Sequence, residues 1–329
     1  MNRKALFWVK LIAIGLIAAF PGLSQAQSNK KAKDESSKKG SVLTEHSATR
    51  YQVGAKVTGG PTPCQNLVVV IPVPIDVPEQ TVTLEDEKVP DSTHSLKFRE
   101  QPGLKQVMAT IPTLPANREL TIQVIVNVRV FRIGLPPDTT VFTIPKSPPK
   151  EAKLYLGTGP GINLKSNKIK EAVKEIVADK PNAWTEVQAI YDWVTTNIQE
   201  TQTDILDAQT AFKEKAGCAE DITGLFVGMC RLHKVPARTV WVDGGVQAEF
   251  FLVDDEEKGA WFPVKLSGLK EFGQNSAPMV ILEKGDDFRV PEKKEPQRFV
   301  SETMVVTGQI APSGCSFFRG KLGGSGSPK

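Results

Sequence analysis

The chain has 329 residues, an apolar content of 40% and a formal net charge of +4. This length and composition are typical of a soluble globular protein of about two domains, and they exclude a largely disordered chain. A charge so close to neutral also gives no electrostatic reason to expect binding to nucleic acid.

The first 26 residues have the pattern of an export signal. Arg3, Lys4 and Lys10 make the start basic, a short apolar run follows, and residues 24–26 (SQA) resemble a signal peptidase cleavage site. The apolar run is too short to span a bilayer. We therefore predict a cleaved signal peptide, an exported protein that is periplasmic or extracellular, and no stable membrane span after cleavage. Cleavage removes three cations and takes the net charge from +4 to +1.

Residues 27–41 are polar and lysine-rich, which predicts a disordered linker. The pattern over residues 42–145 is that of β-strands. Its clearest part runs from Leu120 to Val130, where apolar residues occupy every second position. Short runs of this kind, separated by Pro, Gly and Asp turns, predict an antiparallel β-sandwich of about seven strands. This domain is either a binding domain or a structural partner of the rest of the chain.

A proline-rich stretch, residues 145–150 (PKSPPK), is typical of a stiff linker. Beyond it the apolar pattern becomes helical and then returns to strands, which predicts an α+β domain over residues 151–310. The Gly/Ser-rich end predicts a flexible tail over residues 311–329. The sequence contains no phosphate-binding loop and no paired Cys-x-x-Cys zinc pattern, so we expect neither a cofactor nor a metal.

Within the second domain, helical periodicity predicts two helices, over residues 169–176 and 187–198, before the segment that begins at Cys218. After that segment it predicts strands over residues 238–242, 249–253, 261–264, 279–282 and 299–306.

The segment that begins at Cys218 organises the domain and is a third helix. Gly217 and Cys218 precede apolar residues at helical spacing, among them Ile222, Leu225 and Met229. A cysteine at a helix N-terminus lies beside unpaired backbone N–H groups and the positive end of the helix dipole, which favour its thiolate. Cys218 is therefore the candidate nucleophile.

Three segments around this helix resemble the transglutaminase-like superfamily: residues 189–199 (AIYDWVTTNIQ), 216–240 (AGCAEDITGLFVGMCRLHKVPARTV) and 248–264 (AEFFLVDDEEKGAWFPV). The resemblance implies a papain-like α+β core, in which a catalytic Cys opens a helix that packs on a sheet carrying a His and an Asp. It also implies Cys-dependent transglutaminase or peptidase activity, with Cys218 at the position of the family's cysteine.

The other two catalytic positions of that family pattern do not match. The family's His lies four residues before a Glu that corresponds to Glu249, and this chain has Gly245 there. The family's Asp follows a Gly-Trp-x-Pro-Val-like sequence; here residues 260–264 (AWFPV) are followed by Lys265. Both partners of Cys218 are therefore expected to be missing, and we lean towards a protein that is not an enzyme.

None of the three histidines, His46, His94 and His233, replaces the missing base. His233 lies fifteen residues beyond Cys218, which on a helix is ~22 Å along the axis and too far to accept the thiol proton. We expect His233 at the helix C-terminus, where a partly charged imidazole suits the dipole. The other two are expected to be ordinary surface residues.

Cys218 therefore has two interpretations. It is either a functional thiol, assisted by Gln247, Glu249 or a partner protein, or a vestige of the fold that is unreactive or disulfide-bonded. Glu220 and Asp221 stabilise the start of the helix, but their negative charges oppose formation of a thiolate. This favours the vestigial interpretation.

The other cysteines are Cys64, Cys230 and Cys315. An exported protein meets an oxidising compartment in which disulfides persist. A bridge between Cys218 and Cys230 is disfavoured because one helix would separate them by ~18 Å, well beyond the ~7 Å limit for a disulfide. The pairing among Cys64, Cys230 and Cys315 stays open at this point.

Three functions fit these observations. The one we favour is an exported transglutaminase-like protein that is catalytically impaired and binds a peptide or protein. The second is an active cysteine peptidase, amidase or acyltransferase that uses Cys218 with an atypical base. The third is a structural protein of the cell envelope. Thiol reactivity separates the second from the others, and capture of a partner separates the first from the third.

Overall fold

The computed structural model describes residues 41–89, 95–163, 165–202 and 204–323. The predicted signal peptide, nearly all of the predicted linker at 27–41, and His94 lie outside these residues. Within the described ranges, no helix is long and apolar enough to cross a membrane.

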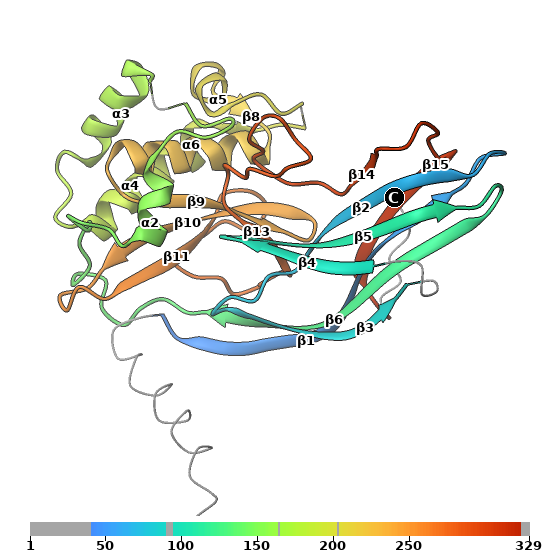
Figure 1. The fold of residues 1–329 in the computed structure, drawn as a ribbon. Coiled ribbons are helices and arrows are strands. Elements are labelled where there is room, and N and C mark those ends of the chain that lie inside the picture. The colour runs from blue at the N-terminus through green and yellow to red at the C-terminus, as the bar shows by residue number, and fades with distance from the viewer. Residues whose placement is uncertain (1–40, 90–94, 164, 203, 324–329) are drawn as a thin grey trace, which may run out of the picture. The chain divides into compact units, whose positions relative to one another are not determined.

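Two antiparallel sheets form a β-sandwich (Figure 1). Their strands are β1 Leu43–Thr58, β2 Cys64–Val73, β3 Gln80–Lys88, β4 Ser95–Gln101, β5 Leu104–Leu114, β6 Glu119–Ile133, β14 Thr303–Val306 and β15 Gly314–Lys321. One sheet has the order β15-β1-β6-β3 and the other has the order β14-β2-β5-β4. Alternate residues of the inner strands, such as Tyr51, Leu67, Ile111 and Ile122, form one buried cluster. The predicted antiparallel sandwich is confirmed.

Two strands of the sandwich come from the C-terminal end of the chain, which corrects the prediction there. A strand at 299–306 is expected in the second domain and a flexible tail at 311–329, but β14 pairs with β2 and β15 pairs with β1. Cys315 and Phe317 of β15 pack against the sandwich core. Burial of these alternate side chains offsets the weak strand propensity of the glycine and serine residues around them.

A third antiparallel sheet, of five strands, forms the core of the remaining chain. It comprises β9 Ala237–Val242, β10 Gly245–Val253, β11 Gly259–Lys265, β12 Glu271–Phe272 and β13 Ile281–Lys284. Its order is β12-β11-β10-β9-β13, so β13 returns to lie beside β9 at one edge. The strands predicted at 238–242, 249–253, 261–264 and 279–282 correspond to β9, β10, β11 and β13, and the mixed α+β fold class is confirmed.

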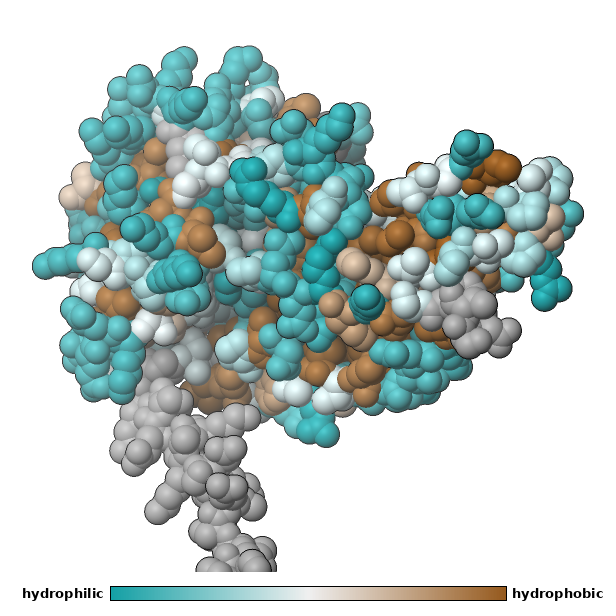
Figure 2. Space-filling model, in the orientation of Figure 1, coloured by the Kyte–Doolittle hydropathy of each residue, from teal (hydrophilic) through white to brown (hydrophobic). Residues whose placement is uncertain are grey.

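The helical elements are α2 Lys150–Lys153, the 3-10 turn η1 Leu154–Leu156, α3 Asn167–Val177, α4 Ala183–Asn197, α5 Ala208–Glu214 and α6 Ala219–Leu232. Helices α4 and α6 pack on one face of the five-stranded sheet, and their apolar residues share a core with Phe250 and Phe262 of the sheet (Figure 1). Hydrophilic residues cover much of the outer surface of the helices (Figure 2). The short elements α2, η1 and α5 are not among the sequence predictions.

The edge strand β13 of the five-stranded sheet makes buried polar contacts with the start of β3 and with the β2–β3 and β4–β5 connections. Gln80 is fully buried and donates to the backbone carbonyls of Ile75 and Ile281, at 2.8 Å each. The backbone N–H of Lys284 donates to the carbonyl of Gly103 at 2.8 Å. Gly103 has φ +74, and a Cβ there would lie 1.8 Å from the Lys284 carbonyl oxygen. Only glycine fits this turn.

The edge strand β13 carries a buried carboxyl group, that of Glu283, which is 0% exposed. Its Oε2 accepts a hydrogen bond from the Val300 N–H at 3.0 Å, whereas Oε1 has no partner among the described residues. Burial raises the pKa of Glu283 to about 8, and the Val300 N–H opposes this only in part. The carboxyl is therefore mostly protonated in the folded protein at neutral pH.

This carboxyl makes the stability of the fold depend on pH. An unfolded Glu ionises near pH 4.3, so the protonated native form is fully stabilising below that pH and loses stability as pH rises to about 8. The loss amounts to roughly 1.4 kcal/mol per pH unit in this window. Urea unfolding at pH 5, 6.5 and 8 should show a smaller decline in the free energy of unfolding for Glu283→Gln than for the wild type. Parallel declines in the two proteins would contradict this assignment.

Candidate functional site

The helix α6 begins directly after Cys218, as predicted. Cys218 has extended backbone angles (φ -76, ψ 172) and occupies the N-cap position. Ile222, Leu225 and Met229 are at most 2% exposed, which confirms the helical face assigned from their spacing. At the other end, His233 is the C-cap residue.

Asp221, the third residue of α6, is the polar contact of the Cys218 thiol. Its carboxylate is 0% exposed. Oδ2 accepts hydrogen bonds from the Cys218 backbone N–H at 3.2 Å and from the Cys218 Sγ–H at 3.1 Å. Oδ1 accepts a third, from the Leu206 N–H at 3.0 Å. A Cβ at residue 217 would lie 2.9 Å from the Asp221 Cβ, which explains the glycine that precedes the cysteine.

The pKa of the Cys218 thiol is raised above its ordinary value. Burial contributes most to this increase in pKa. The hydrogen bond to the Asp221 side chain and the negative charge of Asp221 raise the pKa further. The backbone N–H groups of Asp221 and Glu220 act in the opposite direction but do not outweigh these effects. Because a carboxylate is a far weaker base than a thiolate, the shared proton stays on sulfur.

Gly245 and Lys265, which the sequence predicts to stand at the family's His and Asp positions, offer no base. Gly245 is exposed at the start of β10. Lys265, at the end of β11, is 6% exposed, and its Nζ lies 2.8 Å from Glu271 and donates to the Ala277 carbonyl at 3.0 Å. At the two positions predicted from the sequence, the sheet therefore presents a glycine and a neutralised cation.

The histidines within the described residues lie elsewhere. His233 Nε2 lies 3.0 Å from Glu186, a residue of α4, at the opposite end of α6 from Cys218. His46 is an exposed residue of β1. The expected positions of both are confirmed.

Gln247 and Glu249, the two side chains considered as substitutes for the base, are both buried in β10. Glu249 forms ion pairs with Arg238 and Lys284. Burial alone would raise the pKa of Glu249, but these two positive charges outweigh it and lower the pKa. The only polar contact of the Cys218 sulfur that we observe within the described chain is with Asp221.

The chain folds closely over the start of α6. Arg298 Nη1 lies 3.6 Å from Glu220, and Arg298 Nη2 donates to the Leu206 carbonyl at 3.5 Å. The cavity beside Glu220 and Arg298, with Trp241 in its wall, has a volume of only about 10 Å³. Ile205 and Leu206, by contrast, are 48% and 51% exposed on the adjoining loop.

Sequence reasoning missed part of this arrangement. The Cys-x-x-Asp spacing corresponds to a capping box, in which the side chain at N3 bonds to the N-cap backbone, and it could have indicated the role of Asp221. Leu206 and Arg298 are brought to the site by the fold, and no local pattern marks either of them.

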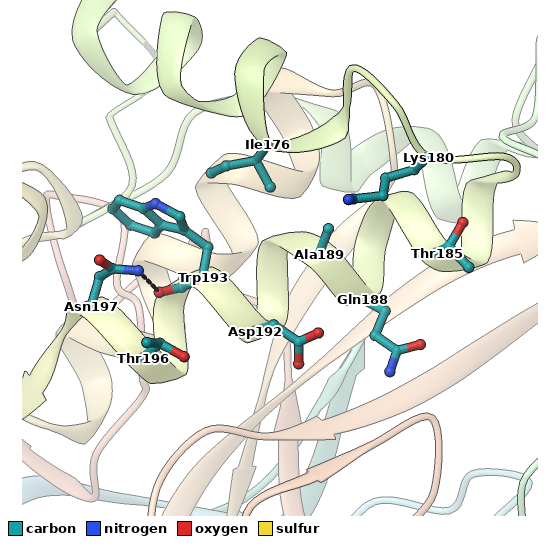
Figure 3. A pocket seen from close by; sticks show the side chains of 9 residues that line it. All are labelled: Ile176, Lys180, Thr185, Gln188, Ala189, Asp192, Trp193, Thr196 and Asn197. Atoms are coloured by element: carbon teal, nitrogen blue, oxygen red, sulfur yellow. Dashed lines mark hydrogen bonds between the residues drawn. The ribbon is translucent and has the colours of Figure 1, made fainter.

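A wider groove of about 550 Å³ lies between α3 and α4 (Figure 3). Its walls include Ile176, Lys180, Asp192 and Trp193. The Trp193 ring stacks on Phe212, with centroids 5.5 Å apart. The groove contains none of the residues of the Cys218 site, so it does not provide access to the thiol.

All four cysteines are free thiols. Cys64 and Cys230 are buried, and Cys315 is partly buried. None of the disulfide pairings left open by the sequence is formed in this structure. Burial raises the pKa of Cys230, so this thiol is inert within α6.

Residues 170–270 match the model of the transglutaminase-like superfamily. The chain therefore carries a transglutaminase-like domain in these residues, as the resemblance implied. No match is found among curated proteins.

One solved structure supports the fold. A candidate cysteine protease from Cytophaga hutchinsonii aligns with 87% of this chain and 95% of its own, at 14% identity and a TM-score of 0.56. At this identity the likeness establishes the fold alone. A candidate protease from Parabacteroides distasonis matches 68% of this chain and 48% of its own, at 16% identity and a TM-score of 0.28. The periplasmic domain of TgpA from Pseudomonas aeruginosa matches 75% and 94%, at 11% identity and a TM-score of 0.33. The last two TM-scores are too low to support an argument about this chain.

Substitution of Asp221 tests its effect on the thiol. Asp221→Asn keeps an oxygen acceptor for the helix start but removes the negative charge that raises the pKa of Cys218. The pH midpoint of Cys218 alkylation by iodoacetamide, followed by peptide mass, should therefore move to lower pH. Glu220→Gln is the matched control and should cause a smaller shift. An unchanged or higher midpoint in Asp221→Asn would contradict the assignment.

Proposed function

We propose that this chain is an exported transglutaminase-like protein that is catalytically impaired and binds a peptide or protein at the surface around Cys218. The observation that carries the proposal is the 3.1 Å hydrogen bond from the Cys218 sulfur to the Asp221 carboxylate. A nucleophilic thiol needs a base that removes its proton, and this partner instead holds the proton on sulfur.

The expected loss of activity is large. Proton transfer by a positioned base typically contributes ~10²–10⁴-fold in rate. Gly245 offers no side chain, and Lys265 is a cation already paired with Glu271. The positive end of the helix dipole remains, but on its own it does not produce the low pKa of catalytic thiolates.

A binding role is supported by the exposed apolar pair Ile205 and Leu206. Two hydrogen bonds fix the backbone of Leu206: its N–H donates to Asp221, and its carbonyl accepts from Arg298. Two apolar side chains on an anchored backbone lose little entropy when a partner covers them. They are therefore suitable anchors for an apolar side chain of a peptide or protein.

Export is the remaining part of the proposal. It rests on the basic start, the short apolar run and the SQA site within the first 26 residues. A cleaved signal would release the protein into the periplasm or outside the cell.

The catalytic part is tested by turnover. Purified protein is incubated with a glutamine-containing protein and a labelled amine, and separately with a peptide mixture analysed by mass spectrometry. We expect amine incorporation and amide hydrolysis to be the same for the wild type and Cys218→Ala, because the thiol is not activated. Turnover that disappears in Cys218→Ala would restore the alternative of an active cysteine peptidase, amidase or acyltransferase with an atypical base.

The binding part is tested by selection from a displayed peptide library. Peptides retained by the wild type should bind Leu206→Arg more weakly by roughly 5–30-fold, the usual effect of losing one apolar anchor. Leu84→Arg is a matched control, since Leu84 is 52% exposed and lies in β3 of the sandwich. Equal loss in both variants, or no selectable peptide, would contradict binding at this surface and favour a structural role.

A further inference from the structure

A second cavity, of about 190 Å³, lies on the face of the five-stranded sheet opposite α4 and α6. One side of it is formed by the β2–β3 connection and the β4–β5 hairpin, through residues 75–77, 100, 101 and 103–105. Arg238 of β9 and Lys284 of β13 form the other side. None of these residues belongs to the Cys218 site.

The inner wall of this cavity carries two cations held in place by buried partners. Lys284, 3% exposed, donates from Nζ to Glu249 at 2.8 Å and to Glu79. An ammonium has three donors, so Lys284 can serve one further acceptor. The Glu249 carboxylate also accepts a hydrogen bond from Arg238 Nε and forms an ion pair with Arg238 Nη2. A guanidinium has five donors, and this pairing uses only part of them.

Arg238 is also fixed by two aromatic rings. Its guanidinium carbon lies 4.0 Å from the centroid of Trp261 and 5.0 Å from that of Tyr155. Stacking of this kind restricts the guanidinium to one plane. Burial would lower the pKa of Arg238, but Glu249 and Tyr155 together, through charge and hydrogen bonds, outweigh burial and raise the pKa. Arg238 is therefore a permanent, preorganised cation at the cavity wall.

The remaining walls are apolar on one side and charged at the rim. Ile75, Val77 and Leu104 provide the apolar surface. At the rim, Lys105 pairs with Glu100 at 2.6 Å, and these side chains are 35% and 65% exposed. Asp76, an exposed carboxylate, also lines the cavity. The cavity thus offers the remaining N–H donors of two buried cations whose charges are paired with Glu249 and Glu79, an aliphatic wall, and both signs of charge near solvent.

We propose that this cavity binds an α-carboxylate that is attached to a short aliphatic side chain. The carboxylate would accept hydrogen bonds from Lys284 and Arg238, and the aliphatic group would lie against Ile75, Val77 and Leu104. The volume is below the ~300–1,000 Å³ of pockets for drug-sized ligands, so it suits a single residue. Two sources have this chemistry, a free amino acid and the C-terminal residue of a peptide.

Isothermal titration of the full chain with N-acetyl-leucine, N-acetyl-leucinamide and free leucine tests the proposal. N-acetyl-leucine should bind saturably and about 10-fold or more tightly than the amide, because only the carboxylate makes charge-assisted hydrogen bonds. Tighter binding of free leucine would identify a free amino acid as the source, and tighter binding of N-acetyl-leucine would identify a peptide C-terminus. Equal affinity for acid and amide, or no binding of any of the three, would overturn the proposal.

Substitutions test whether the carboxylate ligand binds in this cavity. Val77→Trp should abolish binding by filling the space, and Lys105→Met should weaken it about 2–5-fold, as expected for an exposed charge. Lys97→Met is the matched control for Lys105, since Lys97 is an exposed lysine of β4, and it should leave affinity unchanged. Cys218→Ala should also leave it unchanged, which separates this site from the proposed peptide surface. Circular dichroism confirms folding of each variant. Unchanged affinity in both Val77→Trp and Lys105→Met would overturn the assignment.

Discussion

The Asp221 carboxylate links the start of α6 to its surroundings, and the character of the Cys218 site follows from its three hydrogen bonds. It accepts from the Cys218 N–H, the Cys218 thiol and the Leu206 N–H. The first of these bonds satisfies a backbone donor at the helix start, and a contact of this kind typically contributes about 1 kcal/mol. The same carboxylate keeps the thiol protonated. One contact therefore stabilises the helix and opposes the chemistry that a cysteine at this position could perform.

The polar residues on the opposite face of the sheet serve a different purpose. Glu249, Arg238, Lys284 and Glu79 form a buried set of ion pairs that joins the five-stranded sheet to the segment before β3. Removing one member of such a set usually costs about 3–5 kcal/mol, because its partner is left as an uncompensated buried charge. Glu249 is therefore committed to these ion pairs and is unavailable as a base for Cys218. The same commitment fixes Arg238 and Lys284 at the wall of the cavity that we assign to a carboxylate.

Local patterns in the sequence were sufficient to predict most of the elements. Period-two alternation marks β1 and β6, and helical spacing marks α3, α4 and α6. The pairing of β14 and β15 with the first strands was not predictable, because it joins residues more than two hundred positions apart and depends on burial of side chains such as Phe317. The helix α5 has only seven residues and is stabilised by tertiary contacts rather than by a long amphipathic repeat. The position of Cys218 at the start of α6 could be predicted from the sequence, whereas the contacts of Leu206 and Arg298 required the fold.

The protonation state of Cys218 tests the account most directly. Absorbance of the thiolate near 240 nm, recorded from pH 5 to pH 11 as the difference between the wild type and Cys218→Ala, reports this one thiol. We predict a midpoint above the ordinary value of about 8.5, because burial and the Asp221 carboxylate both disfavour the thiolate. A midpoint well below pH 7 would show that the fold activates Cys218 and would contradict the account.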